Sequence, residues 1–129
     1  MTRTVVARQI VESWLDEKWD DIRDAITDEK GRLVSEPPKR RSAEWIFWRA
    51  IRFYSGIDPT LSDLWGKALQ EWGKNLGLPS NTADMLGWEQ CMADAMKRMA
   101  RELGLNPEGA RHYWQKRAYP MAFAGTAGG

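Results

Sequence analysis

Over most of the chain, apolar and polar residues alternate with the period of an α-helix. From Val11 to Ile26, apolar residues recur every three or four positions, with polar residues between them. Residues 45–54 are apolar on nearly all sides, which is typical of a central, buried helix. The pattern predicts an all-α fold, a compact single-domain bundle of about five helices over residues 4–27, 43–54, 61–76, 82–103 and 107–119.

Capping residues support these limits. Ser42 is a suitable N-cap for the second helix. Gly77 and Gly104 follow the third and fourth helices, where a residue with positive φ commonly ends a helix. Asn106 and Pro107 are suited to the N-cap and first position of the fifth helix. We therefore expect one helical domain over residues 1–119 and a flexible, small-residue-rich tail over residues 120–129.

Residues 28–42, DEKGRLVSEPPKRRS, form the one clearly irregular segment of the pattern. Its glycine and its two consecutive prolines favour turns and extended backbone. Lys39, Arg40 and Arg41 make a compact basic cluster within it. Two interpretations are open: the cluster pairs with the acidic face of the first helix, or it contacts phosphate.

The first helix carries a row of acidic residues at every fourth position. Like charges at this spacing lie on one face and destabilise a helix by a few tenths of a kcal/mol each. The row is either a solvated face partly neutralised by Lys18 and Arg23, or a surface that docks on a basic partner. Its members are Glu12, Asp16, Asp20, Asp24 and Asp28.

Net charge and cysteine content narrow the protein class. A formal net charge of +1 in 129 residues argues against coating nucleic acid or membrane by bulk charge. Cys91 is the only cysteine, which excludes an intramolecular disulfide. The first residues lack an apolar stretch of signal-peptide length, and Arg49 and Arg52 interrupt the longest apolar run. We therefore expect a cytoplasmic protein without a membrane segment.

Candidate catalytic residues are few. The single histidine, His112, and Cys91 fall on different predicted helices, so nothing pairs them as base and nucleophile. Neither a phosphate-binding glycine motif nor a metal-ligand spacing is present. The sequence predicts a protein that is not an enzyme and that needs no cofactor and no metal.

Tryptophan is unusually frequent, with eight residues. Each can bury on the order of 200 Å², so they either fill a small core or include anchors for a partner. A methionine stripe along residues 85–99 has the same two interpretations, core or adaptable binding groove. The tryptophans are Trp14, Trp19, Trp45, Trp48, Trp65, Trp72, Trp88 and Trp114.

Residues 96–117 contain the features of a helix-turn-helix. Ala100 is a small residue where two helices would approach closely, and Gly104 is suited to the turn. The residues Met99, Leu103, Leu105, Ala110 and Tyr113 would hold the second helix in place. The segment therefore resembles the helix-turn-helix motif of bacterial and phage regulators.

This resemblance implies that the second helix lies in a DNA major groove, in a protein that can act as a homodimer. From Lys97 to Arg117, cationic residues outnumber acidic ones six to two, so this end is basic. Gly109 departs from the motif, since glycine there costs about 1 kcal/mol of helix propensity relative to alanine. The residues that would face DNA are Arg101, Asn106, Glu108, Arg111, His112, Gln115 and Lys116.

A second function class is also open. The sequence NLGLPSNTA at residues 75–83 is similar to ELGLNPEGA at residues 102–110, which indicates that a sharp helix junction alone can produce the motif. The chain would then be a protein-interaction module, such as an inhibitor or adaptor of the phage or mobile-element accessory type, anti-defence proteins included. Its partner would bind an exposed tryptophan, methionine or acidic surface.

Overall fold

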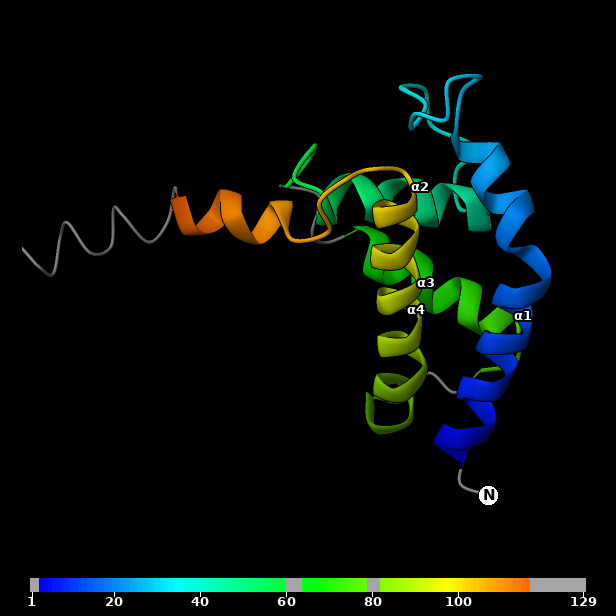
Figure 1. The fold of residues 1–129 in the computed structure, drawn as a ribbon. Helices are drawn as coiled ribbons and strands as arrows, with labels where there is room; N and C mark the ends of the chain where they lie inside the picture. The colour runs from blue at the N-terminus through cyan, green and yellow to red at the C-terminus, as the bar shows by residue number, and fades with distance from the viewer. Residues whose placement is uncertain (1–2, 60–63, 79–81, 117–129) are drawn as a thin grey trace, which may run out of the picture.

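The computed structural model describes residues 3–59, 64–78 and 82–116, which form an all-α bundle (Figure 1). The named helices are α1 (Arg3–Ile26), α2 (Ala43–Tyr54), α3 (Leu64–Asn75) and α4 (Thr82–Glu102). A further helical segment covers residues 109–116. The expected fold class is confirmed, whereas the predicted tail at 120–129 and the end of the last helix lie outside the described residues.

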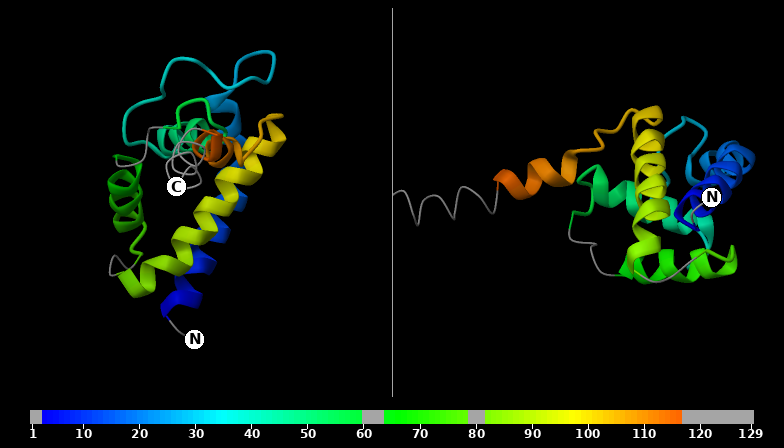
Figure 2. Two further views of the ribbon diagram at one scale, coloured as in Figure 1. Left: turned by 90° about the vertical axis from the view of Figure 1, so that its left-hand side faces the viewer. Right: turned by 90° about the horizontal axis from the view of Figure 1, so that it is seen from below.

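Helix α2 is the centre of the bundle. It packs against α1, α3 and α4, and α1 also packs along α4. Figures 1 and 2 show α1 and α4 side by side, with α2 crossing them near one end. The segment 109–116 leaves the bundle beyond the C-terminal end of α2 and points away from it in Figure 1 and in the right-hand view of Figure 2.

The core is built from the apolar residues that recur at helical spacing in the sequence. Along α1, every third or fourth residue is buried, and the polar residues between them face solvent. In α4 the methionine stripe supplies Met92, Met96 and Met99, each at most 1% exposed, so the described part of this stripe is core. The buried stripe of α1 consists of Ala7, Val11, Leu15, Trp19, Ile22 and Ile26.

The described tryptophans mostly fill this core. Trp72 contacts two other tryptophans, with its ring centroid 4.8 Å from that of Trp14 and 6.3 Å from that of Trp88. Gly73 makes room for Trp88, because a Cβ at Gly73 would lie 2.7 Å from the indole ring. Trp114 is the exception, with 44% of its surface exposed. The core interpretation therefore holds for Trp19, Trp45, Trp48, Trp72 and Trp88.

The irregular segment 28–42 is held against the bundle by hydrogen bonds. An isolated antiparallel bridge joins Thr27 to Leu33, and the carboxylate of Asp28 accepts the backbone N–H groups of Lys30 and Arg32 at 2.9 Å. The indole N–H of Trp48 donates to the carbonyl oxygen of Val34 at 2.8 Å. This segment is therefore joined both to the end of α1 and to the middle of α2.

The cations expected to neutralise the acidic row of α1 contact different acidic partners, and only some of these partners belong to the row. Arg23 contacts Asp20 at 2.9 Å and Asp24 at 4.0 Å, as expected. Lys18 instead contacts Glu17, and Arg41 of the basic cluster contacts Glu71 of α3 at 3.1 Å. Pairing of Arg41 with the first helix was therefore a wrong expectation, because the turn before α2 directs this side chain toward α3. All five carboxylates of the row are exposed.

Candidate nucleic-acid interface at the C-terminal helix

The turn after α4 forms as the sequence predicts. Gly104 has φ +75°, a conformation that favours glycine. Its N–H donates to the carbonyl oxygen of Arg101 at 3.0 Å, and the N–H of Leu105 donates to that of Ala100 at 2.9 Å. These two bonds satisfy the last carbonyl groups of α4 and set the direction in which the chain leaves it.

Asn106 then begins the next helical segment. Its side-chain oxygen accepts the N–H of Glu108 at 3.0 Å, and its backbone oxygen accepts the N–H of Gly109 at 3.1 Å. The amide nitrogen of Asn106 lies 3.3 Å from Nδ1 of His112, six residues further along the chain. The predicted N-cap is therefore confirmed, and it leaves the start of the helix well defined.

Gly109 lies where the last helix meets α2. A Cβ on this residue would lie 2.0 Å from the carbonyl oxygen of Ser55, the C-cap of α2. A Cβ on Gly56, which has φ +81°, would lie 2.9 Å from the carbonyl carbon of Gly109. The two backbones therefore touch directly. This close approach explains the glycine that departs from the helix-turn-helix pattern.

Packing of the last helix is lighter than the sequence suggests. Of the residues expected to hold it, Met99 and Ala110 are buried, whereas Leu103, Leu105 and Tyr113 are half-buried. Ala110, 5% exposed, is the only buried residue that the segment 109–116 contributes. Expecting the whole set to be buried was wrong, because the segment contacts the bundle mainly at its first turn and then projects from it (Figures 1 and 2).

A second attachment involves Trp114. Its indole N–H donates to the carbonyl oxygen of Pro59 at 3.2 Å, so the projecting helix is also bound to the chain after α2. Its ring contacts that of Tyr113 edge-on, with centroids 5.2 Å apart. The exposed part of Trp114 leaves an aromatic surface beside the polar residues of the same helix.

The polar residues predicted to face DNA are exposed, with one exception. Glu108 is half-buried and its carboxylate lies 3.8 Å from Nζ of Lys97. Within the part of the chain that the structure describes, Arg101, Arg111 and Lys116 have no acidic partner within salt-bridge distance. Exposed residues of this set are Arg101, Asn106, Arg111, His112, Gln115 and Lys116.

An aromatic cavity of about 260 Å³ lies between α2, α4 and the last helix. Phe53, Tyr54 and Trp114 line it together with Lys97 and Arg111. Nζ of Lys97 lies 5.1 Å from the centre of the Tyr54 ring. Burial, and to a smaller extent the carboxylates of Glu89 and Asp94, raise the pKa of Tyr54 to about 12. Tyr54 is therefore a neutral phenol throughout the physiological pH range.

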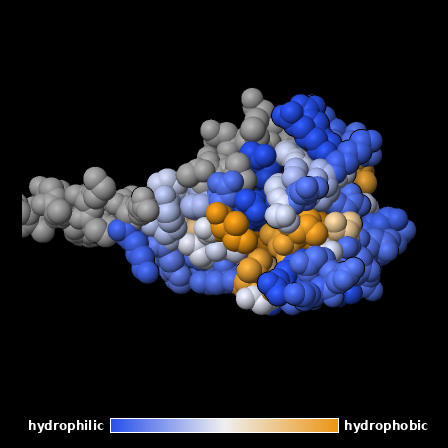
Figure 3. Space-filling view, turned by 90° about the horizontal axis from the view of Figure 1, so that it is seen from above, coloured by the Kyte–Doolittle hydropathy of each residue, from blue (hydrophilic) through white to orange (hydrophobic). Residues whose placement is uncertain are grey.

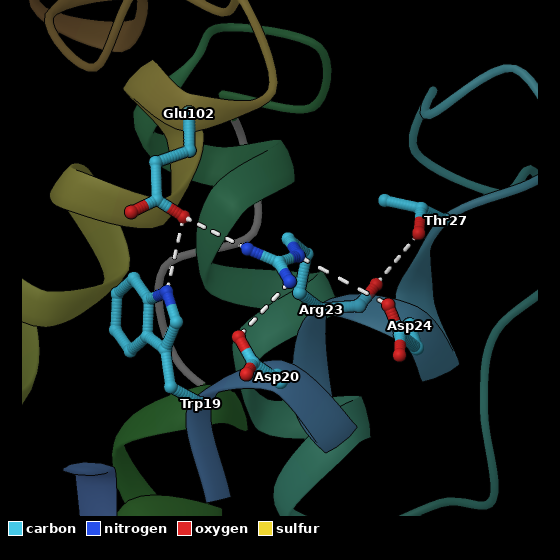
Figure 4. A network of polar contacts seen from close by, with 6 residues as sticks. All are labelled: Trp19, Asp20, Arg23, Asp24, Thr27 and Glu102. Atoms are coloured by element: carbon cyan, nitrogen blue, oxygen red, sulfur yellow. Dashed lines mark hydrogen bonds and ion pairs between the residues drawn. The ribbon is translucent and has the colours of Figure 1, made fainter.

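A polar network fixes the end of α4 that precedes the turn (Figure 4). The indole N–H of Trp19 donates to Oε2 of Glu102 at 3.0 Å, and Nη1 of Arg23 lies 3.9 Å from the same oxygen. The guanidinium carbon of Arg98 lies 3.8 Å from the centre of the Trp19 ring. These contacts connect α4 to α1 and therefore hold the base of the projecting helix.

The basic cluster before α2 is not brought to this site. Lys39 and Arg40 are exposed and precede the N-terminus of α2, whereas the last helix meets its C-terminus. The 12 residues of α2 separate the two by about 18 Å. Any phosphate contact by Lys39 and Arg40 would therefore be a second, separate one, and Arg41 is occupied by Glu71.

A groove of about 520 Å³ between α1 and α4 holds Cys91 and Arg101, with both acidic and basic residues along its walls. Burial raises the pKa of the Cys91 thiol, with a smaller contribution from Glu12, so the thiolate is disfavoured. Among the described residues, no group of three or more histidine, cysteine, aspartate or glutamate side chains could hold a metal ion.

Two further observations describe the chain as a whole. None of the described helices combines the length and the apolar character needed to cross a lipid bilayer. Comparison with known proteins finds no matching family model, no similar curated protein and no similar solved structure.

Proposed function

We propose that the protein binds duplex DNA through the helical segment 109–116 and is not an enzyme. One observation carries this proposal: a capped helix projects from the bundle and leaves Arg111, Gln115 and Lys116 exposed, with no acidic partner among residues 3–59, 64–78 and 82–116. A helix needs to be free on most of its circumference to enter a major groove about 12 Å wide. This segment buries only Ala110 and is therefore free in that way.

Each exposed side chain has a role in this proposal. Arg111 and Gln115, one turn apart, are suited to bidentate contacts with guanine and adenine edges. Lys116 and Arg101 would neutralise backbone phosphates. The N-terminus of the helix adds a partial positive charge, which favours a phosphate beside Asn106. Glu108 is assigned to the ion pair with Lys97 instead of a base contact.

Fluorescence anisotropy with a labelled duplex of about 20 base pairs tests the proposal. Binding is measured between about 50 and 200 mM salt for the wild type and for Arg111→Ala/Lys116→Ala. We expect binding that weakens with salt, a loss of affinity of about tenfold or more in the variant, and a salt slope lower by about 1 to 2.

A matched control is Lys30→Ala/Lys74→Ala. It removes the same charge from exposed residues in the α1–α2 connection and at the end of α3, on the side away from the last helix (Figure 1). We expect this control to bind nearly as the wild type does. Equal losses in the two double variants would mean that only net charge matters, and absence of wild-type binding at low salt would refute the proposal.

A second candidate is self-association through α1. Val6 and Ile10 are 40% and 38% exposed, and with Trp14 they line a groove of about 410 Å³. Val6 and Trp14 each lie four residues from Ile10, so a two-fold axis at Ile10 would pair Val6 of one copy with Trp14 of the other. Sedimentation velocity over a concentration series tests this: Ile10→Glu should abolish a dimer that the wild type forms.

A further inference from the structure

Arg49 and Arg52 of α2 are cations without a counter-ion among the residues that the structure describes. Both residues are half-buried, and their Nε atoms are buried without a hydrogen-bond partner. Within the described part of the chain neither guanidinium has an acidic partner, in contrast to Arg23 and Arg41. Partial burial of a positive charge costs free energy that a bound anion ordinarily offsets.

Each of these guanidinium groups lies over a tryptophan of the preceding turn. The guanidinium carbon of Arg49 is 5.1 Å from the centre of the Trp45 ring, and that of Arg52 is 4.8 Å from the centre of the Trp48 ring. Both indoles are nearly buried, at 6% and 7% exposure. Stacking on a fixed ring orients the guanidinium plane, and Nε is the only nitrogen of each guanidinium that is buried without a hydrogen-bond partner.

The two arginines also lie side by side. Residues three apart on a helix have Cβ atoms about 5–6 Å from one another, and both side chains turn back toward the N-terminus of α2. On the helix they lie opposite the fully buried Phe47 and Ala50, on the face where both residues are half-buried. Two adjacent unpaired cations repel each other, and one anion between them would relieve that repulsion.

We propose that Arg49 and Arg52 form a binding site for a phosphate group on the half-buried face of α2. Guanidinium groups match phosphate oxygens in paired hydrogen bonds, which makes arginine the residue suited to this anion. The site goes beyond the proposed DNA contact, because it shares no residue with the segment 109–116. A free phosphate compound and a nucleic-acid backbone would offer it the same chemistry.

Thermal unfolding with inorganic phosphate in place of chloride, at constant ionic strength, tests the site. At phosphate concentrations about tenfold above Kd, we expect the Tm of the wild type to rise by about 3 °C or more. Arg49→Gln/Arg52→Gln should lose this rise. A matched control, Arg8→Gln/Arg32→Gln, removes two exposed arginines without acidic partners in the described chain and should keep it.

A third variant separates geometry from charge. Arg49→Lys/Arg52→Lys keeps both charges but lacks the planar fork, so its Tm rise should fall below half that of the wild type. Circular dichroism confirms that each variant is folded. Absence of a rise in the wild type, or an equal rise in all four proteins, would overturn the proposal.

Duplex DNA distinguishes the source of the phosphate. If Arg49→Gln/Arg52→Gln also lowers DNA affinity by about tenfold, the DNA backbone supplies the phosphate. Helix α2 then binds DNA together with the segment 109–116. If phosphate stabilises the wild type while DNA binding is unchanged or absent, the site binds a free phosphate compound. The phosphate titration therefore tests the site at Arg49 and Arg52 even if the protein does not bind DNA.

Discussion

The indole N–H of Trp19 donates a hydrogen bond to Oε2 of Glu102 over 3.0 Å, which joins the middle of α1 to the last residue of α4. The two residues are 83 positions apart in the chain. Trp19 is buried while Glu102 is exposed, so the bond lies at the edge of the core. It fixes the end of α4 from which the turn at Gly104 and the projecting helix depart.

Loss of the Trp19 side chain should therefore cost more than loss of the Glu102 charge. Trp19→Phe removes the donor, leaves a cavity and replaces the indole under Arg98 with a smaller ring, for an expected loss of about 2 kcal/mol or more in the free energy of unfolding. Glu102→Gln keeps an acceptor oxygen and should cost less than about 1 kcal/mol. Urea denaturation measures both, and equal losses would contradict this ranking.

Gly109→Ala should detach the last helix although alanine is the better helix former. Helix propensity would favour the substitution by about 1 kcal/mol. The added Cβ would lie 2.0 Å from the carbonyl oxygen of Ser55, and backbone atoms cannot move aside cheaply. We expect the clash to outweigh the propensity. Hydrogen exchange of the amides at 110–116 should become faster, and unchanged protection would show that the junction adapts.

Gly73→Ala should destabilise the core by about 1–3 kcal/mol. A Cβ at this position would lie 2.7 Å from the ring of Trp88, which is 1% exposed and therefore closely packed. Replacing that ring with a smaller one should relieve the clash, so Gly73→Ala/Trp88→Phe should be more stable than the sum of the single effects predicts. Thermal unfolding of all four proteins measures the coupling, and strict additivity would exclude this contact as the cause.

Stability should fall at high pH through Tyr54. Its folded pKa of about 12 lies above the ordinary value of 10.0, so between these values the folded protein binds more protons than the unfolded chain. The stabilisation is complete below about pH 10 and is lost as the pH rises toward 12. At pH 11 the loss should be roughly 1 kcal/mol.

The control for this pH effect is Tyr54→Phe. Its free energy of unfolding should decrease less between pH 9 and pH 11 than that of the wild type, because the titrating phenol is gone. Urea denaturation at both pH values measures the difference. Identical decreases in the two proteins would assign the alkaline loss to other groups.

Local sequence signals were sufficient for the helices and their ends. The stripe from Val11 to Ile26 predicted the buried face of α1, and Ser42 caps α2 as expected. The two Leu-Gly-Leu sequences form the same kind of C-cap, with φ +73° at Gly77 and +75° at Gly104. Such features depend on residues within one or two turns of each other, and for this reason a pattern in the chain reveals them.

Contacts between distant parts of the chain could not be predicted in this way. Arg41 pairs with Glu71 and Lys97 with Glu108, and neither partner follows from charge order along the chain. From the sequence, Gly109 only lowers the propensity of its segment to form a helix. The structure shows why a glycine is needed there, because a Cβ at this position would clash with the backbone of Ser55. Arg49 and Arg52 looked like interruptions of an apolar run, and only the tertiary structure leaves them stacked and unpaired.

The sequence by itself determined an all-α chain, its helix limits, its core stripes and the turn before the last helix. Periodicity and capping depend on residues that are close together in the sequence, so the sequence pattern predicts them. Tertiary structure decided which cations of the described residues lack an acidic partner, how few residues the segment 109–116 buries, and where the backbones of Ser55 and Gly109 touch. Those features depend on distances between residues that are far apart in the chain. Only the packing of the helices against one another determines these distances.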